Sequence, residues 1–388
     1  LRDENRFIVK VNFIEKILAT TLAKLSNFIP EAGIWMNTQR PEWNDANNAL
    51  VGNGVSMVTL YYLRRFLDFF KAVFENTNEN SFEISTELVR FYNNVHDTLK
   101  THQHLLSDSF DDAQRMQVLE PLLKAASDYR SKIYNNAFTG RKTNISLDSL
   151  KDFVNTSISH LEHSIRANRR DDKLFHAYNL ITVEDETAKI SYLNEMLEGQ
   201  VAVLSSKYLS ATKAVEILDA MKRSALFRED QYSYLLYPNK DLPSFINRNT
   251  IPKDQVLKSV LLQQLVANKN TQIIEQDING DYHFNGNLKN ANDLKLALNT
   301  LQKSNYKVLV KKEIQLVLEI FENIFNHKSF TGRSGTFYGY EGLGSIYWHM
   351  VSKLLLSVQE NCLKAIRNNE SSEIIGKLLD HYYEIHAG

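Results

Sequence analysis

Residues 40–54 read Arg-Pro-Glu-Trp-Asn-Asp-Ala-Asn-Asn-Ala-Leu-Val-Gly-Asn-Gly. Within this stretch, residues 42–48 combine two carboxylates, three carboxamides and an indole, directly before a long apolar helix pattern. Carboxylates and carboxamides hydrogen-bond hydroxyl groups, an indole stacks on the apolar face of a sugar ring, and an acid can also transfer a proton. The stretch therefore favours a site for a polyhydroxylated ligand. The alternative is a helix-capping loop with Trp43 as a buried anchor.

The overall charge and the cysteine content exclude several classes of function. The 388 residues carry 46 acids and 45 bases, for a formal charge of −1, which argues against nucleic acid or an anionic membrane as the main partner. With 43% hydrophobic residues the chain can bury a sizeable core, and no apolar run approaches the ~20 residues of a membrane span. The single cysteine, Cys362, excludes an internal disulfide framework. We expect a cytoplasmic location, with the periplasm left open, because many periplasmic enzymes also lack disulfides.

The hydrophobic pattern predicts helices almost throughout the chain. Apolar residues recur at helical spacing in residues 8–28, 55–74, 88–99, 116–133, 147–165, 211–226, 255–266, 294–301, 310–325, 343–366 and 374–385. Evidence for strands is thin, and only residues 280–286 suggest a small hairpin. Residues from about 75 to 166 are more polar, so we expect a peripheral helical insertion there. The pattern predicts an all-α fold with a single domain over residues 1–388.

Two internal segments carry candidate ligand contacts. Residues 169–179 alternate charged, aromatic and amide side chains, so Phe175 and Tyr178 either line a pocket or pack in the core. Residues 197–206 form a short apolar run that we interpret mainly as packing, with Gln200 as its candidate contact to a ligand.

The segment 331–349 is the second candidate loop. Five glycines among residues 332–344 indicate unusual backbone geometry. Glu341 stands at the junction of this loop with the next helix, where it is either a cap or a functional acid. All three tryptophans, Trp35, Trp43 and Trp348, lie in or near the two loops, which suggests that the loops converge on one site.

Four elements in the right order resemble the cellobiose and chitobiose phosphorylases. Residues 42–48 are similar to the D-W-N-D-G-x-N signature of that family, and residues 52–58 stand where its G-x-G-E-S-V-W pattern follows. Residues 200–205 resemble the Q-x-W-A-V-L-S-G stretch, and Glu341-Gly342 with Tyr347 and His349 is similar to the E-N-G-G-x-Y-x-H element. The sequence departs from these patterns at Glu42, Ala46 and Val55 and by one extra residue in the fourth element.

The resemblance implies an (α/α)6 toroid of the six-hairpin glycosidase type, without the family's N-terminal β-sandwich and early barrel helices. The chain opens on Leu1, and we expect a piece of a longer protein whose missing N-terminal part packs on this domain. The resemblance further assigns the general acid to Asp45 and the sugar subsite beside the scissile bond to Trp43.

These observations together predict a carbohydrate-active enzyme that cleaves or transfers a glycosidic bond of a β-linked gluco-oligosaccharide with inversion. Asp45 protonates the glycosidic oxygen; in a hydrolase Glu341 activates water, whereas a phosphorylase uses inorganic phosphate as co-substrate. No metal and no organic cofactor are predicted. The predicted phosphate ligands are Arg333, Ser334 and His349, and the predicted substrate-binding residues are Arg40, Glu42, Trp43, Asn44, Asn48, Gln200, Tyr338, Tyr340 and Trp348.

Two alternatives remain at this point. The chain can be a non-catalytic glycan- or protein-binding helical domain derived from such an enzyme, or it can carry another activity, such as that of a lyase or an epimerase, on the same fold.

Overall fold

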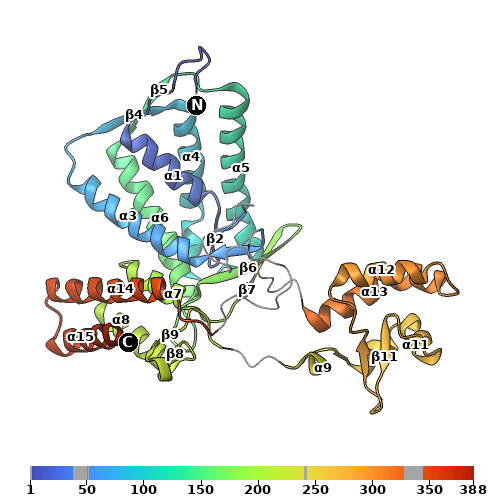
Figure 1. The fold of residues 1–388 in the computed structure, drawn as a ribbon. Helices are drawn as coiled ribbons and strands as arrows, with labels where there is room; N and C mark the ends of the chain where they lie inside the picture. Colours follow the sequence, from blue (N-terminus) through green and yellow to red (C-terminus); the bar gives the residue numbers. More distant parts are fainter. Residues whose placement is uncertain (1, 38–49, 51, 240–242, 327–343) are drawn as a thin grey trace. The chain divides into compact units, whose positions relative to one another are not determined.

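The computed structural model describes the chain except for residues 1, 38–49, 51, 240–242 and 327–343. The chain divides into two compact units. Unit 1 comprises Leu1–Asn239 and Gly342–Gly388, and unit 2 comprises Lys240–Glu341. Figure 1 shows both units.

Helices make up most of unit 1, and polar caps define where they begin. Ser56 accepts a hydrogen bond from the backbone N–H of Thr59, and Asp111 and Gln114 form a reciprocal capping box. The helices are α1 (Phe13–Leu25), α3 (Met57–Glu75), α4 (Thr86–Thr101), α5 (Asp112–Asn136), α6 (Leu147–Ala167), α7 (Leu197–Ser205), α8 (Ala211–Arg223), α14 (Trp348–Arg367) and α15 (Ser372–Ala387).

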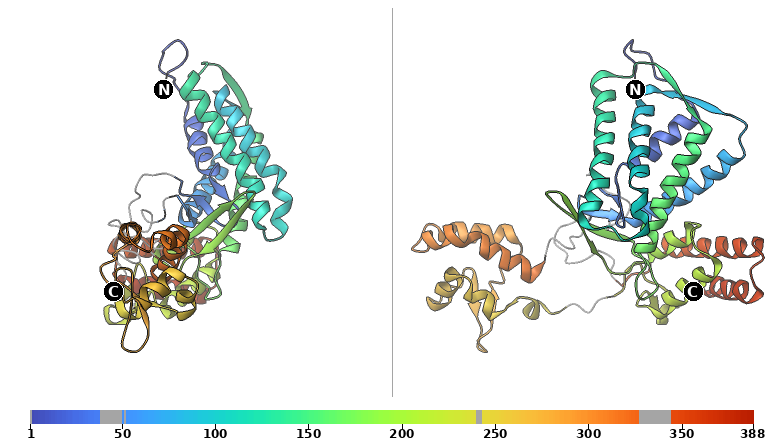
Figure 2. Two further views of the ribbon diagram at one scale, coloured as in Figure 1. Left: turned by 90° about the vertical axis from the view of Figure 1, so that its right-hand side faces the viewer. Right: turned by 180° about the vertical axis from the view of Figure 1, so that it is seen from behind.

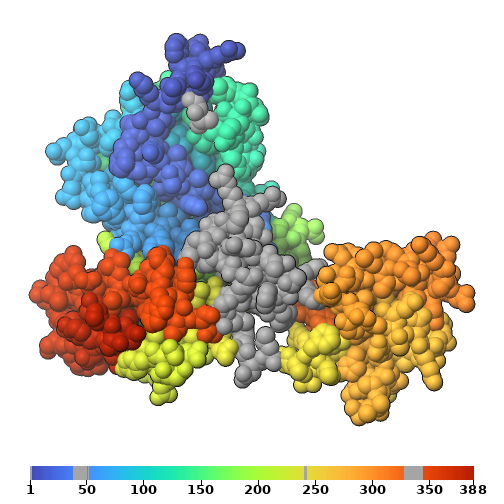
Figure 3. All heavy atoms as spheres, viewed as in Figure 1, coloured from blue at the N-terminus to red at the C-terminus, as the bar shows by residue number. Residues whose placement is uncertain are grey.

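Two groups of helices in unit 1 meet where α3 packs on α7. Leu60, Leu63, Leu67 and Phe70 lie on one face of α3 and are buried, and α3 packs against α6 and α7. Helices α4, α5 and α6 run beside α1 and α3, as the turned views of Figure 2 show. Helix α14 packs on α7, α8 and α15, and the α14–α15 pair forms part of the surface of unit 1 in Figure 3.

A five-stranded antiparallel sheet stands among these helices, so the prediction of an all-α (α/α)6 toroid was wrong. Its strand order is β1-β2-β3-β6-β7. A buried cluster that includes Ile29, Val55 and Ile181 from the sheet and Leu119 from α5 packs one helix onto it. The strands are β1 (Phe28–Ile29), β2 (Gly33–Trp35), β3 (Gly54–Ser56), β6 (Tyr178–Glu184) and β7 (Thr187–Tyr192).

The pattern missed this sheet for physical reasons. Strands β1, β2 and β3 have two or three residues each, which is too short for an alternating pattern to show. The hairpin β6–β7 turns at Asp185 and Glu186 without a glycine, and Asp185 takes a φ of 44°. Two smaller sheets of unit 1 pair β4 (Ser81–Ser85) with β5 (Lys142–Ser146) and β8 (Phe227–Arg228) with β9 (Ser233–Tyr234).

Unit 2 forms a separate core of helices around a small sheet. Its buried cluster includes Leu262, Phe284 and Phe321. The strands follow the order β10-β12-β11, so the hairpin suggested at residues 280–286 does contain a strand, but its partner lies earlier in the chain. The elements are α9 (Phe245–Arg248), β10 (Thr250–Ile251), α10 (Lys253–Leu257), α11 (Val260–Ala267), β11 (Ile274–Gln276), β12 (Tyr282–Phe284), α12 (Ala291–Leu301) and α13 (Lys307–Phe325).

The chain segments that bracket unit 2 pair with each other inside unit 1. Leu235 and Ile346 form an antiparallel bridge, and the backbone N–H of Leu236 donates to the carbonyl of Ser345 at 3.0 Å. A Cβ built on Gly344 would lie 3.0 Å from Asn239 Oδ1. Unit 2 therefore leaves and rejoins unit 1 at one place, which is the geometry of an inserted domain. Residues 75–166, where we expected an insertion, form β4, α4, α5, β5 and α6 of unit 1, and their status as an insertion stays a prediction.

A buried polar network supports the turn between β1 and β2. Glu31 is 5% exposed and accepts hydrogen bonds from Arg115 at 2.8 Å, His163 at 3.2 Å and the backbone N–H of Phe110 at 3.1 Å. Burial acts to raise the pKa of Glu31, but these hydrogen bonds and the charge of Arg115 outweigh it, so the pKa is lowered. Asn168 also donates to the carbonyl of Glu31 at 2.6 Å, which ties this turn to the end of α6.

Within the part of the chain that the structure describes, no helix is long and apolar enough to cross a membrane.

We predict that residues 240–343 can be replaced by a short Gly-Ser linker without unfolding unit 1, because Asn239 and Gly344 already lie together. Circular dichroism and thermal unfolding should show a cooperative unit 1. Removal of residues 75–166 is the contrasting deletion and should unfold it, because α4 and α6 pack on α1 and α3. A soluble, cooperative protein after the second deletion, but not after the first, would contradict this division of the chain.

We predict that Glu31→Gln lowers the free energy of unfolding at pH 7 by about 3 kcal/mol, because it removes the buried carboxylate that faces Arg115. The pKa of Glu31 in the folded state lies below the unfolded value of about 4.3, so this stabilisation is present above that value and is lost as the pH falls through the folded pKa. Denaturant titrations from pH 7 downward should show the difference between the two proteins shrinking.

The matched control is Asp112→Asn, which removes the more exposed carboxylate paired with the same arginine and should cost at most about 1 kcal/mol. A Glu31→Gln effect that stays constant over the whole pH range would contradict the assignment.

Candidate functional site

Most of the site residues predicted from the sequence lie outside the described residues. These are Arg40, Glu42, Trp43, Asn44, Asp45, Asn48, Arg333, Ser334, Tyr338, Tyr340 and Glu341. Gln200, Trp348 and His349 are described, together with the residues that flank both loops. Two motif stretches, residues 40–54 and residues 331–349, hold most of the predicted site residues, and the elements that lead into and out of them show where the site lies.

The first motif stretch connects β2 to β3, and the described ends of this connection are hydrogen-bonded to each other. The backbone N–H of Met36 donates to the carbonyl of Gly54 at 2.9 Å, and the carbonyl of Met36 accepts a hydrogen bond from the backbone N–H of Gly52 at 2.8 Å. The indole N–H of Trp35 donates to the carbonyl of Gly52 at 2.9 Å. Gly52 has a φ of 97°, and a Cβ on Gly54 would lie 2.6 Å from the carbonyl oxygen of Leu50. The glycines after the motif thus close the connection and lead directly into α3.

The second motif stretch ends at the start of α14. Trp348 is the first residue of α14 and is 55% exposed, and the ring of His349 lies 5.9 Å from that of Tyr347. The backbone pairing of residues 235–237 with residues 344–346 fixes where this helix begins. The proposed roles of Trp348 and His349 in binding stay predictions.

Gln200 lies in α7 and holds the segment before β6. Its side-chain amide accepts from the backbone N–H of Phe175 at 2.9 Å and donates to the carbonyls of Phe175 at 2.8 Å and Met196 at 3.0 Å. The side chain is fully buried. In the described structure Gln200 therefore orders the backbone, and its predicted contact to substrate remains a prediction.

Gly199 allows α7 to approach the same segment. A Cβ at this position would lie 2.9 Å from the Cβ of Ala177 and 3.0 Å from its Cα and backbone N. Tyr178, the next residue, pairs with Ser56 of β3 in the sheet. Gly199 and Gln200 thereby bring the first turn of α7 against the segment that leads into β6, the strand that pairs with β3.

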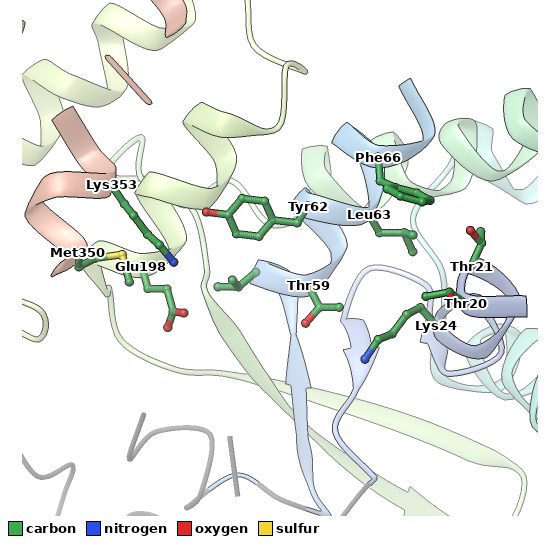
Figure 4. Close-up of a pocket in the computed structure, with 11 residues that line it drawn as sticks. Thr20, Thr21, Lys24, Thr59, Tyr62, Leu63, Phe66, Glu198, Met350 and Lys353 are labelled. Atoms are coloured by element: carbon green, nitrogen blue, oxygen red, sulfur yellow. The ribbon is translucent and has the colours of Figure 1, made fainter. Parts of the chain in front are cut away.

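A cavity of about 360 Å³ opens where α1, α3, α7 and α14 face one another (Figure 4). Its volume lies in the range of small-molecule sites. Helices α3 and α14 follow the two motif stretches in the chain, and both contribute residues from their first two turns. The lining residues are Thr20, Thr21, Lys24, Val58, Thr59, Tyr62, Leu63, Phe66, Glu198, Met350 and Lys353.

Glu198 is the buried acid of this cavity. It is 4% exposed, it occupies the first turn of α7, where the helix dipole favours a negative charge, and its Oε2 accepts the hydroxyl of Tyr178 at 2.8 Å. Burial, and next the negative charge of Glu198, raise the pKa of Tyr62, so the Tyr62 hydroxyl stays protonated at neutral pH. The cavity thus combines one carboxylate, a neutral phenol, hydroxyls and two lysines.

Glu198 lies in the apolar run of residues 197–206 but was not among the site residues predicted from the sequence. An acid at the second position of a helix is usually a simple complement to the helix dipole, and no spacing rule links residue 198 to residues 24, 62 and 353. The arrangement suits a polyhydroxylated ligand with an anionic group. Among the described residues no cluster of three or more His, Cys, Asp or Glu could hold a metal ion.

The comparisons with known proteins address unit 2. Residues 242–328 match the family model described as GH149 phosphorylase insertion domain 2. A search of curated proteins found no match. The match coincides with the inserted unit and supports an enzyme of the glycoside phosphorylase kind, of the GH149 type, which is related to the cellobiose and chitobiose phosphorylases but is not the same.

We predict that Gly199→Ala destabilises unit 1 by about 1–3 kcal/mol, because the added methyl would press on the backbone of Ala177. Helix propensity alone predicts the opposite sign, since alanine is favoured over glycine by about 1 kcal/mol inside a helix. Gly376→Ala in α15 is the matched control, because a Cβ there meets no atom within 4 Å, and it should be neutral or stabilising. Equal effects of the two substitutions on thermal unfolding would contradict the close approach.

Proposed function

We propose that the chain is the part of a glycoside phosphorylase that cleaves a β-linked gluco-oligosaccharide with inversion and inorganic phosphate as the nucleophile. The observation that carries this proposal is the match of residues 242–328 to the insertion domain of GH149 phosphorylases. The order of the four sequence elements supports it independently, because none of the motif residues lies in the matched segment.

The cavity of unit 1 offers a place for this chemistry. The two motif stretches precede α3 and α14, and residues from the first two turns of both helices line the cavity. Lys24 and Lys353 supply positive charge for an anionic co-substrate, and Glu198, Tyr62 and the threonines supply partners for hydroxyl groups.

The proposed reaction is a single displacement. A phosphate oxygen forms a bond to the anomeric carbon from the face opposite the leaving group while the glycosidic carbon–oxygen bond breaks. Asp45 donates its proton to the leaving oxygen and ends as a carboxylate. Inversion of a β-linkage makes the product an α-glycosyl phosphate, together with an oligosaccharide that is shorter by one unit.

Phosphate and water make different demands on the protein. Phosphate is already a nucleophile and needs cations and hydroxyls, for which Arg333, Ser334 and His349 are the proposed ligands. Hydrolysis would need a second carboxylate, for which Glu341 is the candidate, about 6.5–9.5 Å from Asp45. The match to a phosphorylase model favours phosphate.

We predict that the chain, incubated with a panel of β-linked gluco-oligosaccharides, releases an α-glycosyl phosphate only when phosphate is present, and that Asp45→Asn abolishes this release while thermal unfolding stays unchanged. Phosphorus and proton NMR of the products identify the phosphate ester and its anomer.

Asp185→Asn is the matched control, since Asp185 lies in the exposed β6–β7 turn at a φ of 44°, which asparagine also accepts. Release of free sugar at the same rate without phosphate would point to a hydrolase and contradict the proposal. Binding of the glycan without any turnover would point to the non-catalytic alternative.

A further inference from the structure

We propose that Glu198 is the carboxylate that binds the hydroxyl groups of a glucosyl unit in the cavity, and that Tyr178 is its positioning residue. This inference rests on the proposed function for the class of ligand, a gluco-oligosaccharide. It concerns a residue of α7 that lies outside both motif stretches and that the resemblance does not assign to the site.

The burial of Glu198 requires an explanation. A carboxylate that is 4% exposed loses most of its hydration, which is costly unless hydrogen bonds replace it. The hydroxyl of Tyr178, itself 2% exposed, supplies one such bond at 2.8 Å. A carboxylate has about four acceptor positions, so it can accept ligand hydroxyls in addition to hydrogen bonds from the protein. Its place on the cavity lining puts it within reach of a bound ligand.

The surrounding backbone holds both side chains in a fixed relation. Tyr178 lies in β6, where it pairs with Ser56, and the backbone N–H of Met57 donates to the carbonyl of Ala177 at 2.9 Å. On the other side, Gly199 contacts Ala177 and Gln200 binds Phe175. The carboxylate is therefore positioned before any ligand arrives, and such preorganisation lowers the entropic cost of binding.

The rest of the cavity has the character of a sugar site. Figure 4 shows the hydroxyl of Tyr62 and the ammonium of Lys353 on the same side of the cavity as the carboxylate of Glu198, whereas Lys24 and Thr59 lie on the other side. Val58, Leu63 and Phe66 add apolar surface to the lining of the cavity. A pyranose has an apolar face and a rim of hydroxyls, so it can use the apolar surface and the carboxylate together.

The test is direct binding of β-linked glucose disaccharides, namely cellobiose, laminaribiose and gentiobiose, measured by calorimetry on the full chain without phosphate. For the disaccharide that binds, Glu198→Gln should weaken binding about ten-fold or more, as expected for loss of a hydrogen bond to a charged group. Tyr178→Phe should weaken it less, and in turnover assays it should raise KM while kcat and its pH profile stay unchanged.

Two further variants separate this role from general effects on folding. Glu198→Asp keeps the charge at the start of α7 but withdraws the carboxylate, so it should retain the fold and still lose affinity. Glu313→Gln is the matched control, because Glu313 is a buried carboxylate of unit 2 that accepts hydrogen bonds from the hydroxyl of Ser259 and the backbone N–H of Leu261. It should leave sugar binding unchanged.

Unchanged binding in folded Glu198→Gln or Glu198→Asp protein would overturn the inference. A loss of kcat with an altered pH profile and an unchanged affinity would also overturn it, because Glu198 would then act in proton transfer. The outcome is independent of the proposed reaction. If sugar binding depends on Glu198 but the chain does not use phosphate, the proposed phosphorylase reaction is wrong and this inference stands. If Glu198→Gln protein carries out phosphorolysis at the normal rate, the proposed reaction stands and this inference is wrong.

Discussion

The contact between the first turn of α7 and residues 175–178 determines the geometry around the cavity. Gly199 has no side chain where the backbone of Ala177 passes. The side-chain amide of Gln200 forms hydrogen bonds with the backbone of Phe175 and Met196. A buried amide left unpaired would be costly, so this segment has little freedom to move. Because Tyr178 pairs with Ser56, the N-cap of α3, the same contact sets where α3 begins relative to α7.

The helices could be predicted because each long one buries a single face. Helix α3 shows this with Leu60, Leu63 and Leu67, and its predicted range of 55–74 differs by only a few residues from Met57–Glu75. The sheet could not be predicted in the same way. Its first three strands are too short to show a period, and their pairing depends on contacts far apart in the sequence. Helix α7 is buried on every side, so it lacks the alternation of polar and apolar faces that marks a helix.

The candidate site could likewise be predicted only in part. Composition and order alone brought out the stretches 40–54 and 331–349, and the helices that follow them do line one cavity. The apolar run and the resemblance both pointed to Gln200, whereas in the structure Gln200 holds the backbone and Glu198, two residues earlier, lines the cavity. Only the fold shows that difference, because it depends on which side of α7 faces the strand. The inserted unit, which matches a phosphorylase insertion domain, was likewise not distinguished by composition.

We propose that unit 1 is a sugar-binding framework that carries two motif-bearing connections and an inserted domain. The most direct test of this proposal is a crystal structure of the chain soaked with a β-linked gluco-oligosaccharide. We expect a glucosyl unit in the cavity between α1, α3, α7 and α14, with its hydroxyls in hydrogen-bond distance of the Glu198 carboxylate. An oligosaccharide bound elsewhere on the chain, with this cavity empty at saturating ligand, would contradict it.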